Sequence, residues 1–504
     1  MLRFKKEYML LGGLWFGCGK PDPNLFLEPL YKELKTLKKG VYFNVFGHVR
    51  HVLVKAGLLA GTGDSPARAV FLCHKFFNGL YGCLKCLSRG EKSERTSMHF
   101  VYPFEENLVL RTEVNYLEHL AELRRLRVTR PAITDSFGIK GPTILKNMLI
   151  SSLVRSTAID VMHCVFQGVM KTFMELWFME KFKDEAYSLF ARKDVVSDLL
   201  LSIKPPYSLP IFYLVMEQVY FNHFKLLYLG VCLLCKHSVT EADLLLSQSL
   251  LDKFVQRYEE LYGMSKMVYN VHILRHLPGV VKETGPLFTT SCFTYENLNG
   301  VLKYIVHGTQ YVGLQVQNNF ELITNVNVML GNLQPSNFKD FCIEMASNKL
   351  RVRVVEELGN GLFILGPVVL EGNVSYFRKL KVNADIYVSH SVNATRKKDS
   401  SFVKYYFNEH IHYGIVHIFV KLTTCACLGI CLCAGECFAL IQRLDCKLPF
   451  QTLFPNEIIS TVSKYTVSNI VDKVPVSAIS SQCVNVIVND SCYVTPVVNA
   501  YFFQ

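Results

Sequence analysis

The chain has 504 residues, of which half are hydrophobic and 19% are charged, and its formal net charge is +12 at pH 7. This composition excludes a wholly disordered chain, and the length suits two or three domains with large cores. The basic excess favours a polyanionic partner such as nucleic acid; the alternative is that it only keeps the protein in solution.

The cysteine content indicates a reducing, intracellular compartment. The seventeen cysteines are an odd number, and the charged segment Met1–Tyr8 is unlike a secretory leader. We therefore expect thiols or metal ligands in place of disulfides. We also expect no contact with a membrane, because the nearest apolar run, Leu422–Gly435, is too short to span one.

The first part of the chain predicts alternating strands and one long helix. We expect strands at the apolar runs Tyr8–Gly17, Val41–Val45 and Val52–Ala60. Asn24–Lys39 shows helical apolar spacing, so we expect a helix there. The last strand runs into Asp64, just before a helix that begins near Pro66. Ligand groups collect at such strand ends in α/β sheets, so Asp64 is a candidate metal ligand. The alternative is that Asp64 only caps the following helix.

Two half-sites with the spacing of zinc ligands lie far apart in the sequence. Cys83 and Cys86 form a Cys-x2-Cys turn, and His272 and His276 are four residues apart, so a helix would place both imidazoles on one face. Together they would make a Cys2His2 site. The alternative for the histidines is an amphipathic helix with two partly exposed rings.

Two further groups have a functional and a structural interpretation. Asp160 and His163 are three residues apart and could form a carboxylate–imidazole pair, either as an accessory to a site or as a core feature. The predicted helix Glu105–Arg130 ends in a basic cluster that could contact phosphate or simply be solvated. The basic residues are Arg124, Arg125, Arg127 and Arg130.

The pattern is helical from Val165 to Gly279, which predicts an all-α block, and a further helix is expected at Leu314–Leu330. Glu296 begins another helical pattern and is a second candidate carboxylate ligand. After Arg351, apolar and polar residues alternate between turns, which predicts a β-rich end. Within it, the Cys-x-Cys pairs of Cys425–Cys437 do not match a usual zinc spacing.

In this order, the motifs resemble the catalytic core of CACTA/En-Spm-type DNA transposases, especially the animal branch. The segments that carry the resemblance over roughly residues 5–325 are Gly63–Ala69 (GDSPARA), Tyr81–Leu87 (YGCLKCL), Ala158–Val169 (AIDVMHCVFQGV) and Phe293–Gln310 (FTYENLNGVLKYIVHGTQ). The catalytic subunit of V(D)J recombinase is similar in its Cys-x2-Cys and histidine pair, at matching distances from the second aspartate and the glutamate.

The resemblance implies an RNase H-like α/β core, interrupted by an all-α insertion and followed by an all-β region. The implied parts are a partial core at residues 1–110, a helical insertion at 111–280, the glutamate helix and end of the core at 281–345, and a β-rich domain at 346–504. It also implies that the family's first catalytic aspartate lies upstream of this chain, so that the acidic triad is incomplete.

The resemblance further implies what such a core does. Asp64 and Glu296 would bind Mg²⁺ in a two-metal site for DNA cleavage and strand transfer, and Cys83, Cys86, His272 and His276 would hold a structural Zn²⁺. The implied partners are DNA and a second copy of the chain, in the nucleus. With one aspartate missing, we expect a transposase-derived protein without activity, or a binding module that keeps the fold.

Overall fold

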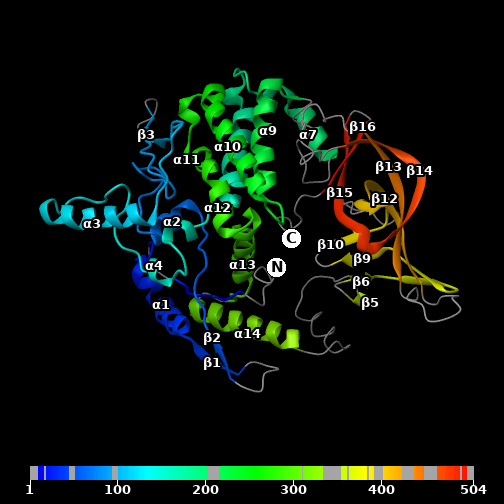
Figure 1. Ribbon diagram of the computed structural model, residues 1–504, viewed down its shortest axis with the longest axis horizontal. Helices are drawn as coiled ribbons and strands as arrows, with labels where there is room; N and C mark the ends of the chain where they lie inside the picture. The colour runs from blue at the N-terminus through cyan, green and yellow to red at the C-terminus, as the bar shows by residue number, and fades with distance from the viewer. Residues whose placement is uncertain are drawn as a thin grey trace. The chain divides into compact units, whose positions relative to one another are not determined.

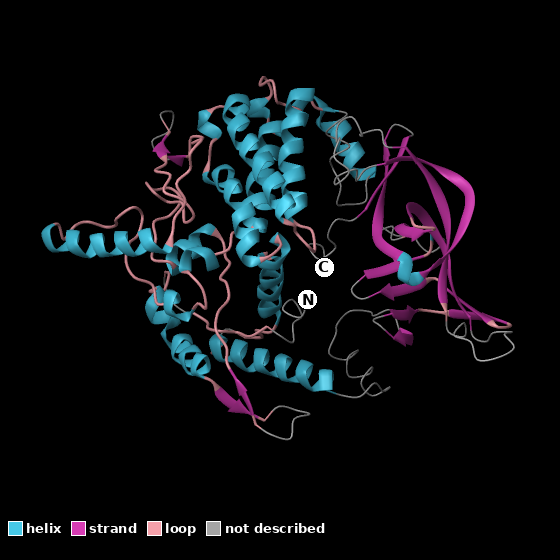
Figure 2. Ribbon diagram, in the orientation of Figure 1, coloured by secondary structure: helices cyan, strands magenta, loops and turns pink. Residues whose placement is uncertain are grey.

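Helices dominate the first two thirds of the chain and antiparallel strands the last third, as Figures 1 and 2 show for this computed structural model. The residues that the structure describes are 9–15, 19–44, 51–93, 100–202, 215–308, 310–332, 354–359, 362–382, 385–390, 401–422, 436–447, 463–488 and 491–496. The chain divides into two compact units, residues 1–187 with 222–343, and residues 188–221 with 344–504. The predicted helical middle and β-rich end are thus confirmed.

Capping residues of the sequence set the ends of the principal helices. The α-helices are α1 (Pro23–Lys39), α2 (Ser65–Phe71), α3 (Glu113–Thr129), α4 (Leu145–Met148), α5 (Leu153–Ser156), α6 (Met170–Phe178), α7 (Lys193–Ser202), α9 (Gln218–Leu234), α10 (Glu241–Tyr262), α11 (Tyr269–His272), α12 (Leu277–Thr284), α13 (Phe293–Tyr304) and α14 (Val312–Asn332). Asp22 caps α1 through the amides of Asn24 and Leu25, and Thr240 caps α10 through Asp243. Gly263, at φ +86°, ends α10 where a side chain would be strained.

Short helical turns of other pitch join these helices. The π-helix η3 is Met162–Val169, and the 3₁₀ turns are η4 (Glu180–Phe182), η5 (Phe190–Arg192), η6 (Met264–Lys266), η7 (Ile273–His276), η8 (Leu287–Thr290) and η10 (Val476–Ala478). Among the described helices, none is both long enough and apolar enough to cross a bilayer.

Aromatic rings fill the centre of the helical block. Phe173 and Trp177 of α6 stack with centroids 4.7 Å apart, and Phe173 meets Phe224 of α9 and Phe254 of α10 edge to face, each at 6.0 Å. Phe173, Trp177 and Phe254 are fully buried. Such pairs stabilise by about 0.5–1.5 kcal/mol beyond the area they bury, so the block has a specific core and not merely an apolar one.

The strands expected near the N-terminus are shorter than the sequence suggests. Residues 9–15, the described part of Tyr8–Gly17, form no strand; Gly12 and Gly13 give no side chain to pack, and no described strand pairs with the segment. The antiparallel pair β1 (Val41–Phe43) and β2 (Val52–Val54) covers the other two predictions in part. A second short pair is β3 (Glu91–Lys92) with β4 (Phe100–Val101).

After β2 the chain pairs in parallel with a later segment. Leu58 bridges Leu149 and Gly61 bridges Thr157, with amide–carbonyl distances between 2.8 and 3.2 Å. Asp64 therefore follows the last parallel bridge by three residues and sits directly before α2. The predicted strand Val52–Ala60 is thus a strand only at Val52–Val54, and Asp64 follows isolated bridges and not the end of a continuous strand.

The C-terminal strands form two antiparallel sheets. The strands are β5 (Val354–Gly359), β6 (Leu362–Leu365), β7 (Val368–Glu371), β8 (Val374–Phe377), β9 (Lys379–Val382), β10 (Asp385–Val388), β11 (Phe402–Phe407), β12 (His410–Leu422), β13 (Cys437–Lys447), β14 (Ser463–Pro475), β15 (Ile479–Val488) and β16 (Ser491–Pro496). One sheet has the order β10-β9-β6-β5; the other has β11-β15-β16-β14-β13-β12-β8-β7, and β11 also pairs with β12. That extra pairing closes six strands into a ring and leaves no open edge among them.

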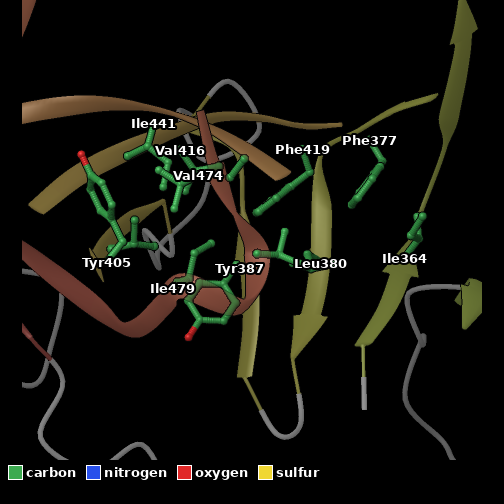
Figure 3. Close-up of a cluster of buried hydrophobic side chains, with 13 residues drawn as sticks. Ile364, Phe377, Leu380, Tyr387, Tyr405, Val416, Phe419, Ile441, Val474 and Ile479 are labelled. Atoms are coloured by element: carbon green, nitrogen blue, oxygen red, sulfur yellow. The ribbon is translucent and has the colours of Figure 1, made fainter. Parts of the chain in front are cut away.

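Side chains from both sheets share one core. Figure 3 shows Ile364, Leu380 and Tyr387 of the four-stranded sheet facing Phe377, Phe419 and other residues of the larger sheet. Phe377 and Phe419 stack at 5.6 Å. Buried and exposed positions alternate at both ends of β14, over residues 463–466 and 472–475, as the period of two predicts for a strand with one buried face.

A buried ion pair joins two neighbouring strands of this ring, β13 and β14. Asp472 of β14 is 4% exposed and accepts from both guanidinium nitrogens of Arg443, at 2.7 and 2.9 Å, and from the Tyr405 hydroxyl at 2.5 Å. Burial alone would raise the pKa of Asp472, but the hydrogen bonds from Arg443 and Tyr405 outweigh it and lower the pKa. The carboxylate therefore stays ionised inside the sheet.

We expect Asp472→Ala to lower the free energy of unfolding at pH 7 by about 3 kcal/mol, because it leaves Arg443 and the Tyr405 hydroxyl without their acceptor. Since the folded pKa of Asp472 is depressed, this contribution is present above the unfolded pKa of about 3.9 and disappears as pH falls through the folded value. Urea unfolding at several pH values measures it. The exposed Asp445→Ala on β13 is the control, and an equal loss there would contradict the assignment.

Candidate metal centre and the acidic cluster beside it

The loop that carries Cys83 and Cys86 is held in a tight conformation. A Cβ atom on Gly82 would lie 2.4 Å from the Phe76 carbonyl oxygen and 2.8 Å from the Tyr102 hydroxyl oxygen, so only glycine fits there. The amide of Lys85 approaches Cys83 Sγ at 3.5 Å. The loop thus turns both thiols inward, and both cysteines are 0% exposed.

The histidine pair lies where α11 passes into η7 and α12. The winding tightens to 3₁₀ between His272 and His276, which differs from the continuous α-helix that the sequence predicted. Arg275 anchors the turn: its Nε donates to Asp252 of α10 at 2.6 Å, and its guanidinium lies over the Phe104 ring. Both histidines are buried, so the alternative of two partly exposed rings is wrong.

The two half-sites meet. Cys83 Sγ lies 3.5 Å from His276 Nε2, and Cys86 Sγ lies 3.2 Å from His272 Nε2. All four ligand atoms are within 4.8 Å of one another. In a tetrahedral zinc site with the usual Zn–S and Zn–N bond lengths, a sulfur and a nitrogen are about 3.6 Å apart. The two sulfur–nitrogen separations in this cluster are close to that distance.

The electrostatics of the cluster suit a metal. Burial alone would raise the pKa of Cys83, but the hydrogen bond from Cys86 and the two imidazoles outweigh it and hold the pKa well below the usual range. That hydrogen bond, followed by burial, raises the pKa of Cys86. Burial lowers the pKa of His276, which favours the neutral imidazole that binds metals.

The four residues could therefore bind a zinc-like ion. Thiolate and imidazole are the ligands that Zn²⁺ prefers, and four protein ligands fill a tetrahedron without an open position. A centre of this kind stabilises a fold and does not activate water. It would join the loop after α2 to the helices before α13, which are almost two hundred residues apart.

Two buried residues that the sequence analysis missed support this centre. Arg111 donates to the carbonyl oxygens of Cys83, Tyr81 and Phe137, at 2.8 to 3.2 Å. The Tyr102 ring lies 4.8 Å from the His272 ring, and its hydroxyl donates to the Phe77 carbonyl oxygen. An arginine at the end of an apolar run is the one signal that could have revealed Arg111.

Asp64 has the role that the structural alternative predicted for it. Its Oδ1 accepts from the Ala67 amide at 2.6 Å and caps α2. A carboxylate has two oxygens, and the cap uses only one of them. Asp64 also lines a cavity of about 350 Å³ together with His163, so the capping role does not remove it from a site.

Asp160 is the most fully bonded carboxylate of the region. It is 1% exposed, and its oxygens accept from the amides of Met162, His163 and Cys292 at 2.8 to 3.2 Å. Its Oδ2 also lies 2.5 Å from His163 Nδ1. His163 belongs to η3, and π-helical turns of this kind frequently occur at functional sites.

Glu296 joins this pair. Its Oε1 lies 3.1 Å from His163 Nε2, on the side of the ring opposite Asp160. The side chain of Glu296 is 50% exposed and that of His163 is 28% exposed, so the row of three groups runs from the core to solvent. His163 is thus the residue that contacts Glu296 and also shares a cavity with Asp64.

These acidic groups do not assemble a magnesium site. Asp64 and Glu296 do not occur together in any group of three or more close metal-ligating atoms among the described residues. Asp160, His163 and Cys292 do form such a group, but Asp160 is surrounded by N–H donors, and burial raises the pKa of Cys292 to about 12. The predicted Mg²⁺ is therefore not supported by this arrangement.

The four arginines at the end of α3 differ in their hydrogen bonds. Arg127 donates to the carbonyl oxygens of Ile133, Thr134 and Lys140, which commits it to the adjacent loop. Arg124, Arg125 and Arg130 are exposed.

The remaining predicted group, Cys425–Cys433, lies outside the described residues, and Cys437 begins β13 as a free thiol.

Comparison with known proteins gives no family. No family model matches the chain, and no curated protein matches it either. The function is therefore argued from the geometry above.

We expect the purified protein to contain about one zinc ion per chain. Cys83→Ser or His276→Ala should remove it and lower the melting temperature, because one lost ligand opens the tetrahedron. Metal analysis and thermal unfolding measure both effects. Cys164→Ser, a buried thiol outside the cluster, should keep its zinc, and a stably folded wild type free of metal would contradict the assignment.

The tight loop gives an independent test. Gly82→Ala should lower zinc affinity by about tenfold or more, because the new methyl group meets the Phe76 carbonyl and displaces the loop. At Gly79, three residues earlier, a Cβ would lie 3.3 Å from the flexible Lys75 side chain and 3.5 Å from the Phe76 carbonyl oxygen, which is an ordinary contact distance. Competition with a chelator should therefore separate Gly82→Ala from an unaffected Gly79→Ala.

Proposed function

We propose that this chain is a transposase-derived DNA-binding protein of the CACTA/En-Spm kind, whose core is stabilised by a Cys2His2 zinc centre. One observation carries the proposal: the resemblance required Cys83 and Cys86 to meet His272 and His276 across the helical block, and they do. A chance Cys-x2-Cys turn has no reason to meet a distant histidine pair with this geometry.

Local pairing adds support for a divergent RNase H-like core. The parallel bridges of Leu58 with Leu149 and of Gly61 with Thr157 are the kind of pairing on which an α/β core is built. Asp64 follows the second bridge by three residues, and Glu296 lies in the first turn of α13; these two residues are the ones that match the family's second aspartate and its glutamate. In this proposal the helical block is the insertion between those two residues.

DNA binding follows from the charge of the chain and from exposed basic side chains. The net charge is +12, and Arg124, Arg125 and Arg130 lie at the exposed end of α3. Their guanidinium groups can pair with phosphate oxygens, and such contacts release counterions from DNA. Arg127 is excluded from this role because its donors bind its own loop.

A second candidate, a DNA-cleaving enzyme, is favoured by the convergence of Asp64 and Glu296 on His163. The alternative without cleavage is favoured by the positions of these groups, since Asp64 and Glu296 do not occur together among the close metal-ligating atoms of the described residues. This fact decides our choice, because a hard cation needs several carboxylate oxygens at one place.

We expect salt-sensitive binding of duplex DNA. The triple variant Arg124→Ala, Arg125→Ala, Arg130→Ala should reduce the slope of log affinity against log salt by about 2–3, one for each lost phosphate contact. Fluorescence anisotropy at several salt concentrations measures the slope. The control removes three exposed lysines from another surface, Lys171, Lys181 and Lys183, and should leave the slope nearly unchanged.

A nicking assay on supercoiled DNA with Mg²⁺ or Mn²⁺ separates the two candidates. Binding without nicking supports the proposal. Nicking that requires the cation and is lost in Glu296→Gln supports the enzyme instead. A protein that binds no DNA at any salt concentration overturns both.

A further inference from the structure

The cavity beside Asp64 is lined by residues that take no part in the proposed DNA contacts. It measures about 350 Å³ and is lined by aromatic, amide and apolar side chains as well as by Asp64 and His163. The aromatic and amide residues are Phe77, Phe100, Tyr269, Asn78 and Asn270. Ligand pockets measure about 300–1,000 Å³, so this cavity suits one flat ring system and not a duplex.

The aromatic wall is rigid on one side and open on the other. Phe77 stacks on Tyr269 with centroids 5.6 Å apart and an interplanar angle of 27°. Tyr269 is 5% exposed, whereas Phe77 is 39% exposed. A ring that is supported from behind and open in front is the arrangement on which a nucleobase stacks, and such stacking contributes about 1–3 kcal/mol per base.

The metal centre supports this wall. The Tyr102 ring meets Tyr269 edge to face at 5.5 Å and lies 4.8 Å from the ring of the ligand His272. The rings of Phe77, Tyr269, Tyr102 and His272 thus form a continuous row. The wall of the cavity therefore belongs to the element that the Cys2His2 cluster holds in place.

The polar groups of the cavity match the edge of a base. The amides of Asn78 and Asn270 each offer a donor and an acceptor, and Asp64 offers an acceptor for a base N–H such as that of thymine N3. Asn270 is fixed by close packing, since its Nδ2 lies 2.5 Å from where a Cβ on Gly168 would be. Phosphate is a poor match, because no lysine or arginine is among the described residues that line the cavity.

We propose that this cavity binds an unpaired nucleobase of DNA, stacked on Phe77 with its polar edge toward Asn78, Asn270 and Asp64. The inference rests on the proposed DNA binding and adds a specific recognition element to it. A base can enter only when it is out of its duplex, so the cavity selects bulged, mismatched or single-stranded DNA. The electrostatic contacts of α3 make no such distinction.

The test compares two duplexes that differ in one base. One carries a single bulged thymine and the other an abasic residue at the same bulge, so their phosphates are identical. We expect the full-length, zinc-containing protein to bind the thymine bulge about tenfold more tightly by anisotropy. Phe77→Ala should abolish this ratio, Phe77→Trp should keep it, and Tyr42→Ala, an exposed aromatic of β1, should not change it.

Three outcomes decide the matter. Equal affinity for both bulges, with DNA binding otherwise intact, overturns the cavity but leaves the proposed function standing; no DNA binding at all overturns both. If Phe77→Ala does not fold, Asn78→Ala and photocrosslinking of a bulged 5-iodouracil replace it. Crosslinks to Phe77, Phe100 or Tyr269 support the cavity, and crosslinks elsewhere overturn it. Competition by thymidine monophosphate alone, with equal binding of both bulges, would assign the cavity to free nucleotides instead.

Discussion

The contact between the Cys83–Cys86 loop and the His272–His276 turn is the constraint on which the helical unit depends. Its two shortest contacts join residues that are 186 and 193 positions apart in the chain, and α3 to α10 lie between these positions in the sequence. Closing a loop of this length costs chain entropy that weak contacts recover poorly. Four buried ligands would supply a strong local interaction instead if they held one cation, and the buried Arg111 holds the loop in the conformation they need.

Asp160 organises the neighbouring site in a comparable way. A buried carboxylate is stable only when its oxygens are satisfied, and here they accept from the start of η3, from the imidazole of His163 and from the Cys292 amide at the start of α13. One charge therefore fixes the π-helix that presents His163 and the helix that presents Glu296. The position of Glu296 depends on Asp160 even though the two carboxylates do not touch.

The C-terminal unit uses a different principle. Its strands close into a ring around apolar side chains shared with a four-stranded sheet, and Asp472, the one buried carboxylate among its described residues, is satisfied by Arg443 and Tyr405. All the groups that carry chemistry in our proposals belong to the first unit. The second unit is a stable β module whose described polar groups serve mainly its own fold.

The sequence by itself determined the local features of this protein. Apolar period and turn residues predicted α1, the helical middle, α14 and the β-rich end, and ligand spacing singled out all four residues of the metal cluster. These features depend on contacts within a few residues, which a sequence displays directly. The same logic failed at Tyr8–Gly17, where an apolar run found no described strand to pair with.

Only the tertiary structure decided what depends on distant partners. It brought the two half-sites to a shared centre, committed Asp64 Oδ1 to a cap and Arg127 to its own loop, and placed Glu296 against His163. It also formed the aromatic cavity from residues on both sides of the helical block. A sequence shows which side chains are present, but burial and hydrogen-bond saturation arise from packing between remote segments, and these decide which of them remain free to bind a ligand.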